Sequence, residues 1–268
     1  MKRLIYKTDL HGNTDAFRRL LNLAKNTDAL IIGGDITPKG GISVDQKIQL
    51  QRQFLQSSFI PEITAFCTLH SLKIFVMMGN DDFRVNMDIL EDAERSGIIT
   101  LLHNRSHRIG QYCIAGYSYV NPTPFNLKDW EKGEFDSTHL QGIRSVDEEA
   151  GSISDDLRGL ANLGNPRETV YVFHAPPFGT NLDLVSGGIH VGSKAIRLFI
   201  EEKQPLLTLH GHIHESPLIS GSHIDKIGRT ICINPGSSPL TDDLNALILN
   251  LANLNEVRVV KDEKEVEE

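Results

Sequence analysis

Three continuous apolar segments in the first 110 residues constrain the fold most strongly. The segments are RLIYKTDL (3–10), DALIIGGD (28–35) and SLKIFVMMGND (71–81). Each ends in glycine, asparagine or acidic residues, and a stretch with helical spacing of apolar residues separates one segment from the next. A strand that is apolar along its whole length is typical of a sheet covered on both faces. Strands separated by helices imply β–α–β units and a mainly parallel sheet. The sequence therefore predicts an α/β fold.

The stretches between these segments carry helix signals. Asn13 or Thr14 can cap the first helix, whose apolar positions share one face: Phe17, Leu20, Leu21 and Ala24. The second helical stretch extends roughly from Val44 to His70, and Pro61 within it marks a break or a second helix start. We therefore expect the three strands to be connected by helices on the face of one sheet.

The second half of the chain has a different pattern. A helical region is expected at 145–163 and a helix at 193–203, and a loop with prolines and aromatic residues is expected at 121–136. Strands are expected at 107–120, 169–177, 205–214 and, as short alternating segments, from 223 to 260. No repeat or linker is evident in the sequence. We expect one domain over residues 1–260, followed by a charged, solvated and frayed tail at 261–268.

Length, charge and cysteine usage narrow the class of protein. The chain has 268 residues, enough for a sizeable core, and its formal net charge of -8 does not support long-range attraction to nucleic acid. The three cysteines lie far apart without a CxxC pair, as expected for buried reduced thiols: Cys67, Cys113 and Cys232. No segment approaches the ~18 apolar residues of a membrane span. We expect a cytoplasmic protein with no membrane partner.

Polar clusters follow five of the expected strands. They are Asp9-Leu10-His11, Gly34-Asp35, Gly79-Asn80-Asp81, His174 and His212-Ile213-His214. Each cluster alone is more typical of a turn or a helix cap than of a site. In open α/β sheets, however, ligands bind beyond the carboxyl ends of the strands, so five clusters in that position would converge on one crevice. Together they predict a metal site.

In this order the five clusters resemble the calcineurin-like metallophosphoesterase superfamily, and the resemblance extends from residue 9 to the NPGS turn at 234–237. The segments NPTPF, GGIHVGS and GHIHES are similar to those of its Icc-related phosphoesterase branch. The resemblance implies an α/β fold of a particular kind, a four-layer α/β/β/α sandwich in which helices flank two mixed sheets. It also implies a binuclear metal centre at one edge.

The ligands of the two metals are likewise implied by the resemblance. The first metal would take Asp9, His11, Asp35 and His214, and the second would take Asp35, Asn80, His174 and His212, with Asp35 as the bridge. Mixed imidazole and carboxylate ligands favour two divalent transition-metal ions, with Mn as the first choice and Fe, Zn, Co or Ni as alternatives. The expected activity is hydrolysis of a phosphodiester or phosphomonoester by a metal-bridging hydroxide.

Asp81 departs from the family pattern, which has Gly-Asn-His at this turn. The family's histidine contacts the phosphate and can donate a proton to the leaving oxygen, which an ionised aspartate cannot do. Asp81 is a candidate catalytic residue, and three interpretations of the departure stay open. The leaving oxygen of the substrate needs little protonation, another group replaces the histidine, or Asp81 points away from the site. Candidates for the replacement are Arg84, His103 and His190. Arg84 and Asp183 are candidate substrate contacts, and Asp183 shares with His190 a loop that could cover the site.

Other functions and the substrate stay open at this stage. A DNA nuclease of the same superfamily and a non-catalytic phosphate-binding or scaffold member are the alternatives. The acidic net charge disfavours nucleic acid as a partner, so a small phosphorylated substrate is expected, and a homo-oligomer is left open. Specificity should lie in the loops at 121–137 and 178–192.

Overall fold

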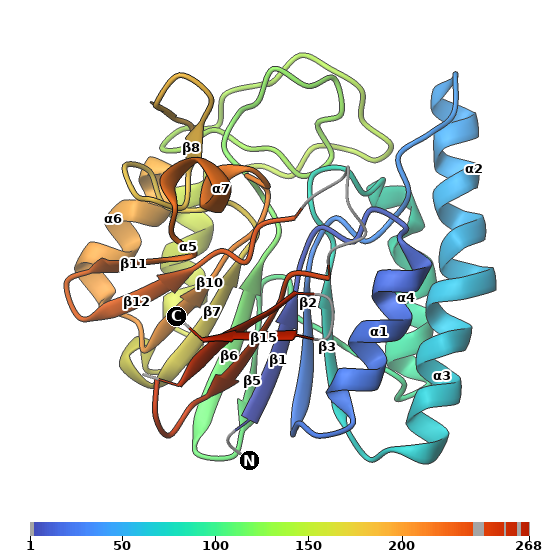
Figure 1. Cartoon of the computed structure of the whole chain (residues 1–268). Helices are drawn as coiled ribbons and strands as arrows, with labels where there is room; N and C mark the ends of the chain where they lie inside the picture. Colours follow the sequence, from blue (N-terminus) through green and yellow to red (C-terminus); the bar gives the residue numbers. More distant parts are fainter. Residues whose placement is uncertain (1–2, 238–243, 255, 262–263, 268) are drawn as a thin grey trace.

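The computed structural model describes residues 3–237, 244–254, 256–261 and 264–267, and these form two large mixed sheets (Figure 1). The first sheet has the strand order β15-β14-β13-β1-β2-β3-β4. Its strands are β1 (Arg3–Lys7), β2 (Ala29–Gly33), β3 (Lys73–Met77), β4 (Thr100–Leu101), β13 (Ala246–Asn250), β14 (Val257–Lys261) and β15 (Lys264–Glu267). Strands β1 to β4 pair in parallel, and β13, β14 and β15 add antiparallel pairs at the other side.

The second sheet has the order β11-β12-β10-β7-β6-β5. Its strands are β5 (Arg105–Ile109), β6 (Tyr112–Tyr117), β7 (Thr169–Phe173), β10 (Leu207–Leu209), β11 (Ile224–Ile227) and β12 (Thr230–Ile233). The inner four pair in parallel, and the two edge strands pair antiparallel. A separate two-stranded ribbon is formed by β8 (Leu184–Val185) and β9 (Ile189–His190).

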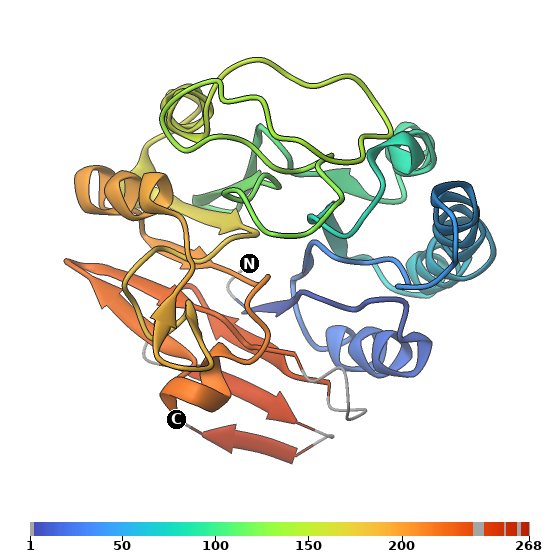
Figure 2. The same ribbon diagram turned by 90° about the horizontal axis from the view of Figure 1, so that it is seen from above.

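Helices cover the outer faces of both sheets (Figures 1 and 2). The face of the first sheet is covered by α1 (Thr14–Ala24), α2 (Val44–Phe54), α3 (Ile60–Leu69) and α4 (Met87–Arg95). The face of the second sheet is covered by α5 (Ile153–Ala161) and α6 (Lys194–Lys203). The shorter helices are η1 (Leu55–Phe59), η2 (Arg84–Asn86), η3 (Pro166–Glu168) and α7 (Ser216–Ser220). The four-layer α/β/β/α sandwich is therefore confirmed.

A cluster of fully buried side chains lies between the two sheets. Alternate residues of β1, such as Leu4 and Tyr6, pack there with residues of the second sheet, such as Val172 and Leu209. The intervening residue Ile5 belongs instead to the cluster formed with the helices. Since side chains of a strand alternate between its faces, each sheet is buried on both sides. This explains the continuous apolar segments in the sequence.

Of the two alternatives expected at Pro61, a break or a second helix start, the structure has the second, and η1 joins α2 to α3 without an interruption of the helical backbone. Residues Leu55–Phe59 form a π-helical turn directly before α3, and Pro61 lies in the first turn of α3. Proline has no backbone N–H to donate, and the wider π turn accommodates the change. At the other end, Ser43 and Gln46 form a reciprocal capping box at the start of α2.

Two expectations differ from the structure. The helical region expected at 145–163 is helical only as α5, because Gly151 has a φ of 96° and Ser152 caps the helix. The frayed tail expected at 261–268 contains β15, whose backbone pairs antiparallel with β14. Residues 262, 263 and 268 lie outside the described residues.

The connection between β6 and α5, residues 118–152, is irregular and lies above the ends of the strands (Figure 1). Isolated bridges join Val120 to Glu131 and Leu127 to Ile143 within it. It contains the proline-bearing loop expected at 121–136. Among the described helices, none has the length and apolar character that a membrane crossing requires.

Candidate metal centre

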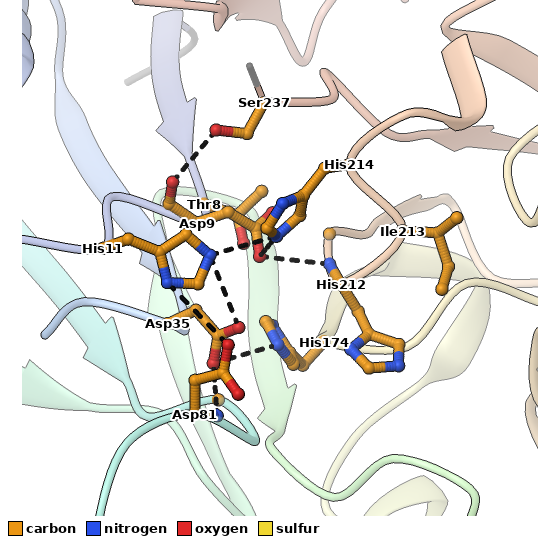
Figure 3. A network of polar contacts seen from close by, with 12 residues as sticks. Thr8, Asp9, His11, Asp35, Asp81, His174, His212, Ile213, His214 and Ser237 are labelled. Atoms are coloured by element: carbon orange, nitrogen blue, oxygen red, sulfur yellow. Dashed lines mark hydrogen bonds and ion pairs between the residues drawn. The ribbon is translucent and has the colours of Figure 1, made fainter. Parts of the chain in front are cut away.

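The connections that follow β1, β2, β3, β7 and β10 meet at one edge of the two sheets (Figure 3). Backbone hydrogen bonds join them directly: Asp9 N–H donates to Gly34 O at 3.0 Å, and His11 N–H donates to Asp35 O at 2.9 Å. Gly211 N–H donates to His174 O at 3.0 Å, which joins the two strand ends of the second sheet. The polar clusters are thus adjacent because parallel strands end at the same edge.

Four of the predicted ligands have an unusual backbone. Asp9, His11, Asp35 and His212 have φ values of 55°, 45°, 50° and 65°, in the left-handed region. Such conformations cost roughly 1–3 kcal/mol each and cluster at functional sites, where the surrounding structure holds them. The concentration of strain here is an independent indication that the side chains are placed for a purpose other than packing.

The first set of ligands comes together closely. The ligand atoms of Asp9, His11, Asp35 and His214 all lie within 4.8 Å of one another. His214 Nε2 is 3.3 Å from Asp9 Oδ1, and His11 Nε2 is 3.8 Å from Asp35 Oδ2. Asp9 Oδ2 is buried and has no hydrogen-bond partner in the described structure. An unpartnered buried carboxylate oxygen beside two imidazoles fits a cation better than it fits a folded protein without one.

A second set lies on the other side of Asp35. His174 Nδ1–H donates to Gly33 O at 2.9 Å, so the lone pair of the neutral ring, the form that binds a metal, lies on Nε2. That Nε2 is 3.1 Å from Asn80 Oδ1 and 3.4 Å from Asp35 Oδ1. Three electron-rich atoms therefore face one point, and Asp35 takes part in both sets. The residues present fit two cations, and Asp35 would be shared by the two sets of ligands.

Among the described residues, no hydrogen bond or ion pair joins the ring of His212 to either set of candidate ligands. Its ring lies beside His174, with ring centroids 5.6 Å apart, and Figure 3 shows it at the side of the cluster. Its backbone N–H donates to Asp9 Oδ1 at 3.2 Å. The NPGS turn holds this segment, since Ser237 Oγ–H donates to Asp9 O at 3.1 Å and Asn234 Nδ2–H donates to Ile213 O at 3.1 Å.

Burial and neighbouring charges shift the pKa values of the cluster. Burial alone would raise the pKa of Asp9, but His214 and the other histidines hold it well below its usual range. Burial and Asp81 raise the pKa of Asp35 to about 6. Burial opposes protonation of His174, but Asp35 raises its pKa to about 9. Bound cations would favour the ionised carboxylate and the neutral imidazole at every one of these positions.

Glycines allow the ligands to approach one another. A Cβ atom on Gly79 would lie 2.4 Å from Asp35 Oδ1 and 2.5 Å from His174 Nε2. A Cβ atom on Gly211 would lie 2.7 Å from Asp9 Oδ2. A side chain at these positions would occupy the volume that the ligand atoms fill, so the glycines of GGD, GND and GHIH are part of the site.

Asp82 is a buried positioning residue. Its carboxylate accepts hydrogen bonds from the backbone N–H groups of Ile36, Thr37 and Gly79, at 3.1, 2.9 and 2.9 Å, and from Thr37 Oγ1 at 2.5 Å. It thereby joins the loop after β2 to the loop after β3. Both loops carry candidate ligands. The second acid of Gly-Asn-Asp-Asp therefore fixes the distance between Asp35 and Asn80.

Asp81 faces the centre and is paired with a lysine. Its backbone N–H donates to Asp35 Oδ1 at 2.8 Å, and its Oδ1 accepts from Asn80 Nδ2 at 3.2 Å. Its Oδ2 is 2.7 Å from Lys39 Nζ and 3.9 Å from His11 Nδ1. Sequence reasoning did not single out Lys39, because TPKGG carries no recognisable motif.

The other predicted contacts lie elsewhere. His190 Nδ1 is 2.7 Å from Asp183 Oδ1, and Asp183 also accepts from the backbone N–H groups of Gly179, Thr180 and Gly192, so it organises its own loop. Arg84 is paired with Glu149 and donates to Tyr119 Oη at 2.9 Å. His103 Nδ1 accepts from Ser118 N–H at 3.0 Å. None of these four candidates lines the pocket over the metal ligands, as the described residues define it.

That pocket has a volume of about 650 Å³. Candidate ligands form part of its wall, including Asp35, Asn80 and His214, and Lys39 and Lys47 supply positive charge. Apolar side chains line another part of the wall: Phe83 and, from the irregular 118–152 segment, Pro124, Phe125, Leu127 and Ile143. The polar residues Gln51, Asn126 and Glu215 also line the pocket. A site of this size suits a small organic ligand with a polar end.

A family model and several solved structures match this chain. The family model of calcineurin-like phosphoesterases matches residues 3–216. No curated protein matches the chain. One solved structure has a TM-score of 0.69 at 18% identity, covering 97% of this chain and 98% of its own.

Two further solved structures share the fold. The protein TT1561 of Thermus thermophilus has a TM-score of 0.63 at 16% identity, covering 97% of this chain and 98% of its own. A dimetal phosphatase from Danio rerio has a TM-score of 0.56 at 10% identity, covering 97% of this chain and 95% of its own. At these identities the likenesses show the fold alone.

Proposed function

The chain belongs to the calcineurin-like phosphoesterase family, and on that premise we propose that it hydrolyses a small phosphomonoester or phosphodiester at a centre of two divalent metal ions. The single observation that carries the proposal is the convergence of Asp9, His11, Asp35 and His214 within 4.8 Å, with Asn80 and His174 on the other side of Asp35. Mn is proposed as the first metal to test, and Fe, Zn, Co and Ni as alternatives.

Two such cations, when bound, would supply positive charge for the phosphate oxygens and would lower the pKa of a water molecule so that it attacks near neutral pH. The protein's own residues orient the ligands. His174 is fixed by its Nδ1–H bond to Gly33 O, and the Asn80 amide is turned by its bond to Asp81, so that Oδ1 faces the centre. Asp82 holds the two loops together.

A small substrate is favoured by the pocket. Its volume of about 650 Å³ lies in the range of small-molecule sites, and both lysines and apolar side chains contribute to its wall. The three cysteines are unpaired, which supports the proposal of a reducing, cytoplasmic setting.

Hydrolysis of p-nitrophenyl phosphate and bis-p-nitrophenyl phosphate by the Mn-loaded protein tests the proposal. We expect activity towards at least one of them, and we expect Asp35→Asn to lower kcat/KM by more than about a hundredfold, beyond the effect of losing an outer-shell partner. Asp147→Asn, which changes an exposed acid, is the control and should behave as the wild type. Full activity of Asp35→Asn would contradict the two-metal centre.

A further inference from the structure

The turn after β3 places a carboxylate where a substrate anion is expected to bind. Asp81 directly follows the candidate ligand Asn80, and both line the pocket. An isolated carboxylate there would repel a phosphate group. The structure offsets this charge, since Asp81 Oδ2 lies 2.7 Å from Lys39 Nζ.

Lys39 reaches this position from a different loop. It follows β2 by six positions, whereas Asp81 follows β3, and Asp82 joins the two loops through the backbone of Thr37. The Lys39 side chain is 57% exposed, so its ammonium group is open to the pocket as well as to Asp81. Partial burial lowers the pKa of the Lys39 amine, but Asp81 and the neighbouring carboxylates raise it by more, so the pKa lies above its usual value. The amine is therefore charged at neutral pH.

The two carboxylate oxygens of Asp81 have separate partners. Oδ1 accepts from the Asn80 amide, and Oδ2 is paired with Lys39. The titratable groups that face this pair from neighbouring elements are Asp35 and His11. The Nδ1 atom of His11 lies 3.9 Å from Asp81 Oδ2, and burial lowers the pKa of His11 to about 2, so this ring is neutral. An ammonium group has three N–H donors and the Asp81 contact uses one, so donors remain for a ligand.

We propose that Lys39, held in place by Asp81, contacts the phosphate group of the substrate. This inference rests on the proposed function and deepens it. Asp81 stands at the sequence position where the family pattern has histidine, and Lys39 is paired with it. The Lys39 ammonium group offers N–H donors to a phosphate oxygen, and Asp81 acts as a positioning residue for both Lys39 and Asn80.

The rest of the pocket wall indicates the class of substrate. Apolar side chains such as Phe125, Leu127 and Ile143 line the same pocket as Lys39. A ligand that fills it would carry an anionic phosphate at the end near Lys39 and an apolar or aromatic group against these side chains. Phosphate esters of aryl or similarly apolar alcohols have this chemistry.

Calorimetric titration of the Mn-loaded protein with inorganic phosphate tests the role of Lys39. Lys39→Met keeps the length of the side chain and removes its charge, which leaves Asp81 unpaired. We expect the Kd for phosphate to rise by about ten- to a hundredfold, the range of a hydrogen bond to a charged group. Lys39→Arg should stay within about threefold of the wild type, because it keeps the charge. Metal content should not change in either variant.

Lys73→Met is the matched control, since Lys73 is exposed at the amino end of β3, away from the pocket. Its phosphate affinity should equal that of the wild type. The proposed role of Lys39 is wrong if Lys39→Met binds phosphate as tightly as the wild type. It is also wrong if this variant loses its bound metal together with its affinity for phosphate. If the wild type itself binds no metal and hydrolyses no phosphate ester, the proposed function fails first, and this result is distinct from the other two.

Discussion

The Nε2 atoms of His11 and His214 lie 3.1 Å apart, although 203 positions separate the two residues in the chain. Two neutral imidazoles cannot both present a lone pair at this distance without a proton or a cation between them. Asp9 Oδ1 lies 3.3 Å from His214 Nε2, so a carboxylate faces the same point. The relationship is typical of ligands that share a metal ion.

Gly79→Ala should disrupt this centre without affecting the rest of the fold. The added Cβ would lie 2.4 Å from Asp35 Oδ1 and 2.5 Å from His174 Nε2, so one of the ligands must move. We expect metal affinity to fall by about tenfold or more, as measured by equilibrium dialysis. Gly159→Ala in α5, whose Cβ would meet nothing within 4 Å, is the control. Equal metal affinity in both variants would show that the close approach is unimportant.

Asp82→Ala should lower the free energy of unfolding. Its buried carboxylate accepts from three backbone N–H groups and one hydroxyl, and these donors would be left without a partner. We expect a loss of about 3 kcal/mol or more in urea unfolding. Asp147→Ala, at an exposed position, should stay within about 0.5 kcal/mol of the wild type. A similar small change for Asp82→Ala would mean that the loops are held by other contacts.

Because of His103, we expect the free energy of unfolding of the protein to fall in mild acid. Burial and the charges of Arg84, Lys132 and Arg105 lower the pKa of His103 to about 3, whereas the unfolded chain takes up this proton below about pH 6.5. The contribution of His103 to stability is therefore complete above pH 6.5 and is lost as the pH falls towards 3.

Between pH 7 and pH 5 we expect His103 to account for about 1 kcal/mol of lost stability, since the side chain is partly exposed. His103→Gln keeps an acceptor for Ser118 N–H and cannot titrate. Urea unfolding at both pH values should show a smaller pH effect in this variant. An unchanged pH effect would assign the acid sensitivity to other groups.

Phe125→Ala should weaken binding of an aromatic ester group but not of phosphate. Phe125 is 58% exposed and lines the pocket over the metal ligands. We expect the KM for an aryl phosphate to rise by about three- to tenfold, with an unchanged Kd for inorganic phosphate. Phe135→Ala, with a residue 54% exposed that does not line this pocket, should change neither value. Equal effects of the two variants would contradict an aromatic subsite at Phe125.

Much of the framework could be predicted because local signals agree with the fold. The apolar segments correspond to β1, β2 and β3, and Asn13 caps α1 by accepting from Ala16 N–H. Parallel strands end at one edge, so the order of the strand-end clusters was enough to bring Asp9 and Asp35 together. The layer order of the sandwich came from the family resemblance and not from periodicity.

Other parts depend on contacts that no local pattern encodes. Lys39 lies beside Asp81 because two loops meet, and a lysine in a loop is usually solvated. His190 and Asp183 pair with each other within one loop, and the sequence leaves open whether this loop covers the site. Arg84 is paired with Glu149, 65 positions away in the irregular segment before α5. Each of these depends on the path of a loop.

A count of the metal ions bound per chain decides whether the centre is binuclear. Metal-depleted wild-type protein, Asp35→Asn and the control Asp147→Asn can be dialysed against Mn and analysed for bound metal and for folding. We expect two ions per chain in the wild type and the control, and fewer in folded Asp35→Asn, because Asp35 is shared by both ligand sets. Two ions per chain in Asp35→Asn, or none in the wild type, would rule out a binuclear centre built on Asp35.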